Sequence, residues 1–472
     1  MRRIALTGLC LASSFVALVG CRLAKKSDPN AGDASVTTNA ATASAAVVAD
    51  ASAPTAKEAK PACAAPDPEK IAKFDCSQSK VVKTPVPEIA DPKNVMAAFY
   101  DKLIAAARGT SKERLRIGIY GDSNLTSDFM PAHIRRVLQG RFGDGGHGWI
   151  SFSRPWGSYK HEDVDNKGFW PMFKLYAPTT HIARDKQYGF ANMAAESKEI
   201  GAAAWAGTTK DEKAKVGKTV KSFEVHYLKQ PYGGSFDIKL DGNVVRTVKT
   251  RADAHEAGIE VVDAETDGPH QVRVEVKGDG YVRFFGTSMD REGPSIQVDS
   301  LGAGALNYER LTWVADDVRK PQWQKRNYDL VIVWLGMNVM FVPPNKDYAK
   351  TFLASLHDAL PNTPVLILGP GDTVKSRDSQ HSDPRIVQVD KQMKEVAEET
   401  GDAFWPFREA MGGDASIIGF TKRGLTGEDF IHFGPEGSAL MGNRLLCRMF
   451  DDLNAHLEKN PEAGCKPTAE KK

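Results

Sequence analysis

The chain has 472 residues, of which 41% are hydrophobic, and its formal net charge at pH 7 is +2. This length allows more than one globular core. The nearly balanced charge gives no bias toward nucleic acid as a partner.

The first 21 residues predict an export signal with a lipid anchor. Met1-Arg2-Arg3 precedes an apolar run through Val19, as in secretory signal peptides. Leu18-Val19-Gly20-Cys21 has the form of a lipobox, so Cys21 is expected to be lipidated and to become the mature amino terminus. Arg22 follows instead of aspartate, and by resemblance to bacterial lipoproteins we expect the outer membrane, facing the periplasm. The alternative is an ordinary cleaved signal with an incidental Cys21.

Residues 22–75 are predicted to form a flexible tether. The stretch from Ala24 to Pro68 is dominated by Ala, Thr, Ser, Asp and Pro. Such a composition cannot bury enough apolar surface to offset the entropy of ordering. Beyond the signal and Cys21, four cysteines remain: Cys63, Cys76, Cys447 and Cys465. In an oxidising compartment they predict two disulfides that bracket the folded region, in one of three pairings.

A helix is expected over residues 92–107, followed by the first buried strand. The largely apolar run from Leu115 to Tyr120 stops abruptly at Gly121-Asp122-Ser123. In parallel α/β sheets ligands bind at the carboxyl ends of the strands. Ser123 is therefore a candidate functional residue at such an end.

The segment after Ser123 is rich in glycine and then in aromatic residues. Gly143 to Ile150 reads as a glycine-rich turn. The aromatic residues are Trp149, Trp156, Tyr159, Phe169, Trp170 and Phe173. They could stack on sugar rings, but packing between domains is the commoner use, so none is assigned as a binding residue.

Residues 201–294 read as β structure. Five segments alternate apolar with polar residues between turn residues: 220–228, 234–240, 258–262, 270–276 and 282–286. Short strands at this spacing predict a small β-sandwich.

Two more candidate sites follow at strand ends. A short strand over residues 295–300 leads into Leu301-Gly302-Ala303-Gly304, where either glycine could turn its N–H toward a site. The apolar run Asp329–Leu335 is typical of a strand covered on both faces and ends at Gly336-Met337-Asn338.

The remaining elements complete a strand–helix alternation. Helices are expected over 348–360 and 386–400, and strands over 364–369 and 403–405. The inner face of the second helix is predicted to carry Val387, Val389, Met393 and Val396. This rhythm predicts a parallel, doubly wound sheet in a three-layer α/β/α sandwich.

Asp429-Phe430-Ile431-His432 places a carboxylate and an imidazole three residues apart, before a long helix that ends near Leu457. A serine needs a base to act as a nucleophile, and His432 has the right chemistry for Ser123. Asp429 would orient that imidazole, and Asn338 offers an amide donor to an oxyanion. No His-Glu-x-x-His or clustered Cys/His spacing occurs, so neither a metal nor another cofactor is expected.

These blocks, in this order, resemble those of the SGNH (GDSL-type) hydrolases. The resemblance implies a flavodoxin-like fold and catalytic roles for Ser123, Asp429 and His432. It also implies an oxyanion hole made by the backbone N–H groups of Ser123 and Gly304 and the side chain of Asn338. Gly304 is preferred because a small residue follows the glycine of this block in the family, and Gly302 stays open as the alternative.

An insertion separates the first two blocks, because Ser123 and Gly304 lie about 180 residues apart. We expect hydrolase segments over residues 76–200 and 295–465 around the inserted β-sandwich of 201–294. This arrangement resembles the peptidoglycan O-acetylesterases, with their jelly-roll, carbohydrate-binding-module-like domain.

The resemblance implies a lipid-anchored serine esterase that removes O-acetyl groups from a cell-envelope glycan, peptidoglycan first. Its expected partners are that glycan and, through the lipid, the membrane. An O-acetyltransferase, another acyl esterase with the same triad, and a non-catalytic glycan-binding lipoprotein are the alternatives.

Overall fold

The computed structural model describes residues 63–74, 76, 82–165, 174–338 and 346–465. The expected signal, the lipidation site Cys21 and most of the expected tether lie outside the described residues, as do Phe169, Trp170 and Phe173. Within these ranges no helix is both long and apolar enough to cross a membrane.

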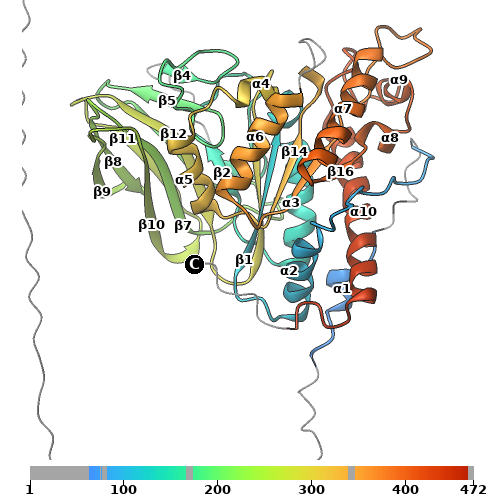
Figure 1. Cartoon of the computed structure of the whole chain (residues 1–472). Helices are drawn as coiled ribbons and strands as arrows, with labels where there is room; N and C mark the ends of the chain where they lie inside the picture. Colours follow the sequence, from blue (N-terminus) through green and yellow to red (C-terminus); the bar gives the residue numbers. More distant parts are fainter. Residues whose placement is uncertain (1–62, 75, 77–81, 166–173, 339–345, 466–472) are drawn as a thin grey trace, which may run out of the picture. The chain divides into compact units, whose positions relative to one another are not determined.

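A five-stranded parallel sheet carries the candidate site residues at its carboxyl edge (Figure 1). Its spatial order is β13-β1-β14-β15-β16, which is 2-1-3-4-5 in chain order, the flavodoxin-like order. Its strands are β1 (Arg114–Gly121), β13 (Ser295–Gly302), β14 (Leu330–Trp334), β15 (Val365–Leu368) and β16 (Ala403–Trp405). β14 and β15 are buried along their whole length, as expected of strands with both faces covered. The predicted α/β/α sandwich is confirmed.

Helices cover both faces of the sheet. One apolar cluster packs the first face against α2, α3 and α10, and a second packs the other face against α5, α6 and α7. The long helices are α2 (Ala97–Arg108), α3 (Phe129–Phe142), α5 (Asp316–Arg326), α6 (Lys346–Ala359), α7 (Pro384–Thr400) and α10 (Pro435–Lys459). Short helical turns are α1 (Pro68–Ile71), η1 (Ser123–Leu125), α4 (Tyr308–Leu311), α8 (Phe407–Ala410) and α9 (Ser416–Thr421).

Two antiparallel sheets form the inserted layer. One has the order β10-β7-β12-β5-β4, with β2 also paired to β12, and the other has the order β3-β6-β11-β8-β9. A shared core of buried side chains from both sheets makes them a sandwich. The bounds are β2 (Gly148–Ser151), β3 (Val164–Asp165), β4 (Lys174–Tyr176), β5 (Ala194–Ser197), β6 (Ala203–Thr208), β7 (Val220–Lys229), β8 (Ser235–Leu240), β9 (Asn243–Lys249), β10 (Glu256–Gly268), β11 (Gln271–Val276) and β12 (Val282–Asp290).

The β layer begins earlier than the boundary expected at residue 201. β2 and β5 both pair with β12, so residues from 148 onward already belong to it. β5 and β6 read AAES and AAWAGT, and alanine dominates both. They lack the alternation of large apolar and polar residues that marks a strand with one wet face.

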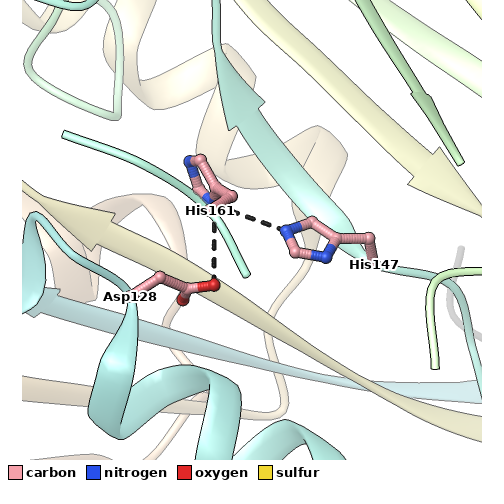
Figure 2. A group of neighbouring side chains, drawn as sticks. All are labelled: Asp128, His147 and His161. Atoms are coloured by element: carbon pink, nitrogen blue, oxygen red, sulfur yellow. Dashed lines mark hydrogen bonds and ion pairs between the residues drawn. The ribbon is translucent and has the colours of Figure 1, made fainter. Parts of the chain in front are cut away.

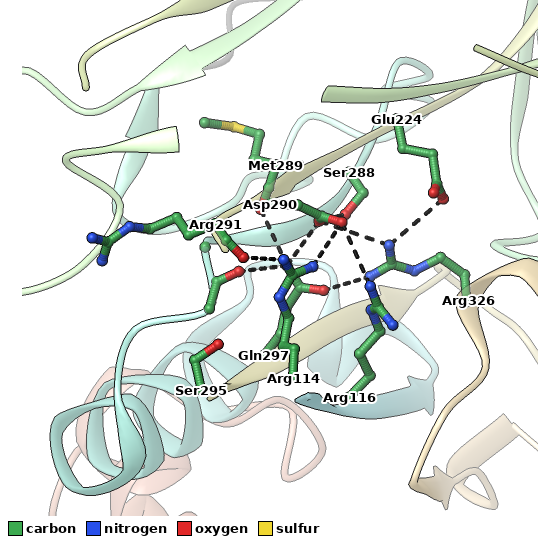
Figure 3. Close-up of polar contacts among 12 residues, drawn as sticks. Arg114, Arg116, Glu224, Ser288, Met289, Asp290, Arg291, Ser295, Gln297 and Arg326 are labelled. Atoms are coloured by element: carbon green, nitrogen blue, oxygen red, sulfur yellow. Dashed lines mark hydrogen bonds and ion pairs between the residues drawn. The ribbon is translucent and has the colours of Figure 1, made fainter. Parts of the chain in front are cut away.

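A buried polar junction ties the β layer to the amino-terminal edge of the parallel sheet (Figure 3). Arg326, at the end of α5, lies 2.9 Å from Asp299 of β13 and 3.8 Å from Asp290 of β12. Arg114, the first residue of β1, lies 2.8 Å from the other oxygen of Asp290. Asp290 thus joins the end of β12 to the start of β1.

Both disulfides join the two ends of the folded region. Cys63 pairs with Cys465 and Cys76 with Cys447, with Cα–Cα distances of 5.4 and 6.4 Å. Of the three pairings open to the sequence, the structure therefore has the nested one.

Two details of the helices differ from expectation. Val387 is 40% exposed, and Ile386 takes the buried position beside Val389. The helix expected from residue 92 begins at Ala97, because the Asp91 carboxylate accepts the N–H groups of Val95 and Met96 and holds residues 92–96 in a turn.

Candidate active site

Ser123 opens a short turn at the end of β1. The Asp122 carboxylate accepts the N–H of Asn124 at 3.0 Å, and the Thr126 hydroxyl donates to the Ser123 carbonyl at 2.8 Å. These two bonds fix the backbone on both sides of Ser123, so its side chain, which is only partly buried, is held at the edge of the sheet.

His432 and Asp429 complete a hydrogen-bonded relay with this serine. The Ser123 Oγ lies 2.7 Å from His432 Nε2, and His432 Nδ1 lies 2.6 Å from Asp429 Oδ2. The side chains of His432 and Asp429 are 48% and 47% exposed. The relay is therefore open to solvent and can be reached by a large substrate.

The backbone of the Asp429 loop positions this imidazole. Asp429 Oδ1 accepts the N–H groups of Ile431 at 2.9 Å and His432 at 3.1 Å. Partial burial raises the pKa of Asp429, but the hydrogen bonds from the side chain and backbone of His432 outweigh it and leave that pKa below its ordinary value. At neutral pH the carboxylate is charged and faces His432.

Asn124 is a site residue that the sequence analysis missed. Its side-chain oxygen accepts the N–H of Phe433 at 3.0 Å, so it clamps the loop of His432 onto the turn of Ser123. It is buried, and its position next to Ser123 was the only signal in the sequence.

Asp122 is buried beneath the relay. Desolvation raises the pKa of Asp122 to about 6, although the N–H of Asn124 and the nearby His432 act in the opposite direction. The charge of Asp122 therefore changes with pH around pH 6.

Asn338 and the two candidate glycines follow neighbouring strands. β13 and β14 flank β1, with Gly302 and Trp334 both opposite Gly121, so their carboxyl ends meet beside Ser123. The Asn338 side chain donates to the Leu306 carbonyl at 3.1 Å. Asn338 therefore lies against the loop that carries Gly304.

The two glycines have different surroundings. A Cβ on Gly302 would lie 2.6 Å from the backbone carbonyl carbon of Leu125, so this glycine allows β13 to approach the serine turn. A Cβ on Gly304 would lie 2.6 Å from the ring of Trp156. Gly304 is thus covered by an indole that is itself only partly buried.

The other aromatic residues near the turn serve packing. Trp149 and Tyr159 are 0% and 2% exposed, and Trp149 lies in the core between the sheets. The glycine-rich turn before Trp149 lets β2 pass close to β13, because a Cβ on Gly148 would lie 2.2 Å from Asp299 Oδ1.

Asp128, His147 and His161 form the one group in the described residues in which three side chains that could bind a metal lie close together (Figure 2). Arg135 already binds both oxygens of Asp128, at 3.0 and 3.2 Å. A cation placed there would face this guanidinium at close range. Burial lowers the pKa of both histidines, that of His161 to about 4, so each is neutral at pH 7. The two neutral histidines and the Asp128–Arg135 ion pair fit a hydrogen-bonded support for the start of α3 better than a metal site.

Comparison with known proteins agrees with this fold. Residues 254–440 match the GDSL-like lipase/acylhydrolase family. The chain is similar to a solved peptidoglycan O-acetylesterase, with 20% identity and a TM-score of 0.64 over 78% of this chain and 99% of that chain. A family two carbohydrate esterase from Clostridium thermocellum matches with 12% identity and a TM-score of 0.25, over 60% of this chain and 99% of the other. A search of curated proteins gave no match.

The segment that matches the family does not include the candidate nucleophile. It contains Gly304, Asn338, Asp429 and His432 but begins after Ser123. The serine reaches the other residues through the pairing of β1 with β13 and β14.

Proposed function

We propose that this chain, of which residues 254–440 match the GDSL-like lipase/acylhydrolase family, is an SGNH-type serine esterase that removes O-acetyl groups from peptidoglycan. The observation that carries the proposal is the continuous relay from Ser123 through His432 to Asp429 at an exposed sheet edge. The likeness of its fold to a peptidoglycan O-acetylesterase supports the choice of glycan.

The first half of the proposed reaction acylates the serine. Ser123 Oγ attacks the acetyl carbonyl carbon while its proton passes to His432 Nε2. The carbonyl oxygen becomes an oxyanion, which accepts hydrogen bonds from the N–H groups of Ser123 and Gly304 and from the Asn338 amide. An amide has two N–H donors, and the bond to Leu306 engages one of them. The sugar oxygen then leaves with the proton from His432.

The second half of the proposed reaction hydrolyses the acetyl-serine and regenerates the free enzyme. Water gives a proton to His432 and attacks the acetyl-serine, and acetate departs as Ser123 regains its proton. The charged Asp429 stabilises the imidazolium in both halves.

Acetate release from O-acetylated peptidoglycan tests this proposal. Ser123→Ala is expected to lower the rate by on the order of 10³-fold or more. Ser127→Ala is the matched control, because the Ser127 hydroxyl lies in the same turn but donates to the Ser158 carbonyl instead. Absence of acetate release by the folded native chain would contradict the proposal. Transfer of the acetyl group to an added glycan acceptor, faster than its release as acetate, would identify a transferase instead.

We also propose that Cys21 anchors the chain to the outer membrane, facing the periplasm. The lipobox Leu18-Val19-Gly20-Cys21 supports this location. The mass of the amino-terminal peptide should then include a lipid, and Cys21→Ser should move the chain from the membrane fraction to the soluble fraction. An unmodified mature terminus would contradict the anchor.

A further inference from the structure

Tyr232 occupies a backbone position that suits glycine. The turn Gln230–Gly233 is closed by the Gly233 N–H, which donates to the Gln230 carbonyl at 3.0 Å. Pro231 is the second residue of this turn, and Tyr232 is the third, with φ at +64°. This is the pattern of a type II turn, in which the third position favours glycine because of its positive φ. A tyrosine at this position therefore lowers the local stability of the turn relative to glycine.

The Tyr232 side chain is 81% exposed, so packing does not account for it. Two other apolar side chains lie at the same end of the β layer: Tyr281 is 38% and Ile200 is 79% exposed. The Tyr281 N–H donates to the Tyr232 carbonyl at 3.3 Å. A Cβ on Gly278 would lie 3.1 Å from Ile200, which places Ile200 against the loop just before Tyr281. We call Tyr232, Tyr281 and Ile200 the tyrosine platform.

Backbone hydrogen bonds to neighbouring segments fix the two turns that carry the tyrosine platform. The Gly234 N–H donates to the Tyr281 carbonyl at 2.9 Å, and the Gly234 carbonyl accepts the N–H of Thr250 at 2.9 Å. A Cβ on Gly233 would lie 2.5 Å from the Thr250 hydroxyl, so the turn sits directly on that residue. Aromatic rings on a fixed backbone lose little entropy when they bind a flat ligand.

The platform lies at the same end of the molecule as Ser123. β12 starts beside Tyr281 and ends at Asp290, which binds Arg114 at the start of β1. From Arg114, β1 runs in the direction opposite to β12, and Ser123 follows its carboxyl end.

A chain of contacts links the platform to the loop of Gly304. Val282 pairs with Ser197 at the end of β5, and Ala194 at its other end pairs with Tyr176. The Thr179 hydroxyl, three residues on, donates to the Gly304 carbonyl at 2.8 Å. The three residue steps along β5 span roughly 10 Å and the two strand-to-strand steps add about 5 Å each, so a polymer of several sugar units, rather than a single sugar, could contact both places.

We propose that the tyrosine platform is a second glycan-binding site, which holds the polymer whose acetyl groups reach Ser123. The proposal rests on the proposed function for its substrate class. Tyrosine offers an apolar ring face to the C–H face of a pyranose and a hydroxyl to its rim. Lys198 lies 5.5 Å from the Tyr281 ring centroid and adds a donor for sugar oxygens. A patch of three apolar side chains with charged neighbours is small for a stable protein interface.

Sedimentation with insoluble peptidoglycan tests the platform, using the full chain with Ser123→Ala so that the acetyl groups stay in place. Adding Tyr232→Gly should weaken binding at least tenfold. Because glycine suits φ +64°, the same change should leave the melting temperature equal or higher. Tyr232→Trp should keep the binding. Val245→Ser is the control, since Val245 is 45% exposed on β9 of the same layer.

A second measurement separates the platform from the active site. With Ser123 intact, Tyr232→Gly should hydrolyse 4-nitrophenyl acetate at the native rate and release acetate more slowly from polymeric substrate only. Equal binding by the native residue and by Tyr232→Gly would overturn the platform, and so would equal loss on the small ester. Tyr232-dependent binding to xylan but not to peptidoglycan would support the platform and reject peptidoglycan as the substrate.

Discussion

Asp429 serves His432 through both of its carboxylate oxygens. One oxygen accepts from the imidazole at 2.6 Å, while the other binds the N–H groups of Ile431 and His432. The side chain therefore fixes both the ring and the backbone that carries it. Because the pair is about half exposed, orientation matters more here than burial of charge.

Asp429→Asn should lower kcat on an acetyl ester by on the order of 10³–10⁴-fold, because an amide cannot stabilise the imidazolium and can favour the wrong tautomer. Asp414→Asn provides a matched control. Asp414 makes a similar contact with His381, at 2.7 Å, outside the relay, so its loss should leave kcat unchanged. Similar kcat losses in both variants would contradict the role of Asp429.

Asp122 gives the unfolding free energy a specific pH dependence. Its pKa is about 6 in the folded chain, against 3.8 for an exposed aspartate. The folded state therefore binds more protons than the unfolded state between these values, and this group makes stability fall as pH rises from about 4 to 7. Asp122→Asn keeps an acceptor for the Asn124 N–H and removes the titration. Relative to the native chain, the variant should gain about 3 kcal/mol across that window.

Urea unfolding of the native chain and of Asp122→Asn at pH 4, 5, 6 and 7 measures this difference. A difference in free energy that stays constant with pH would show that Asp122 does not titrate in this range.

At the level of elements, the serine turn depends on how closely β13 approaches it. Gly302 is the last residue of β13, and its α-carbon faces the backbone of Leu125 in η1. Backbone atoms cannot move aside as a flexible side chain can. The spacing between this strand and the turn is therefore part of the site.

Gly302→Ala should displace η1 and with it Ser123, two residues before Leu125. We expect a loss of about 1–3 kcal/mol in stability from the added methyl group and a fall in kcat. Gly140→Ala is the control, because a Cβ there meets nothing within 4 Å in helix α3. That control should raise stability by about 0.5–1 kcal/mol. Native stability and kcat in Gly302→Ala would show that the turn tolerates the methyl group.

At the level of the whole molecule, two nested disulfides join the two ends of the folded region. They span sequence separations of 402 and 371 residues. Once one of them has formed, the other closes only the short segments between Cys63 and Cys76 and between Cys447 and Cys465. In the chain-entropy model the second crosslink therefore adds less than the first.

Removing the disulfides should consequently show strong non-additivity. Replacing one pair by serine should cost about 4 kcal/mol, and replacing both should cost about 10 kcal/mol, more than twice as much. Thermal or urea unfolding of the two single-pair variants and the four-serine variant measures this. Simple addition of the two single-pair losses would contradict the nested-loop account.

The strands of the parallel sheet could be predicted from the sequence because their signal is local. β1, β14 and β15 are short apolar runs that end at turn residues, and burial on both faces requires that pattern wherever the strand lies. Ser123, Asn338 and His432 were found for the same reason, since each stands just after such an element or just before a helix.

Features that depend on contacts between distant segments were harder to predict from the sequence. Val387 and Ile386 are adjacent apolar residues in α7, and only the packing of that helix decides which one is buried. The alanine-rich β5 and β6 carry no alternation, and their strand character comes from their partners β12 and β11.

The sequence by itself determined the fold class, the ends of the main strands and the residue types of the candidate relay, because periodicity and turn chemistry are local properties. Tertiary structure alone decided the nested cysteine pairing, the clamp by Asn124, the close approach at Gly302 and the exposure of Tyr232. Each of these depends on which segments meet after folding. Such meetings are set by the packing of whole layers and leave little trace in the neighbouring residues of the chain.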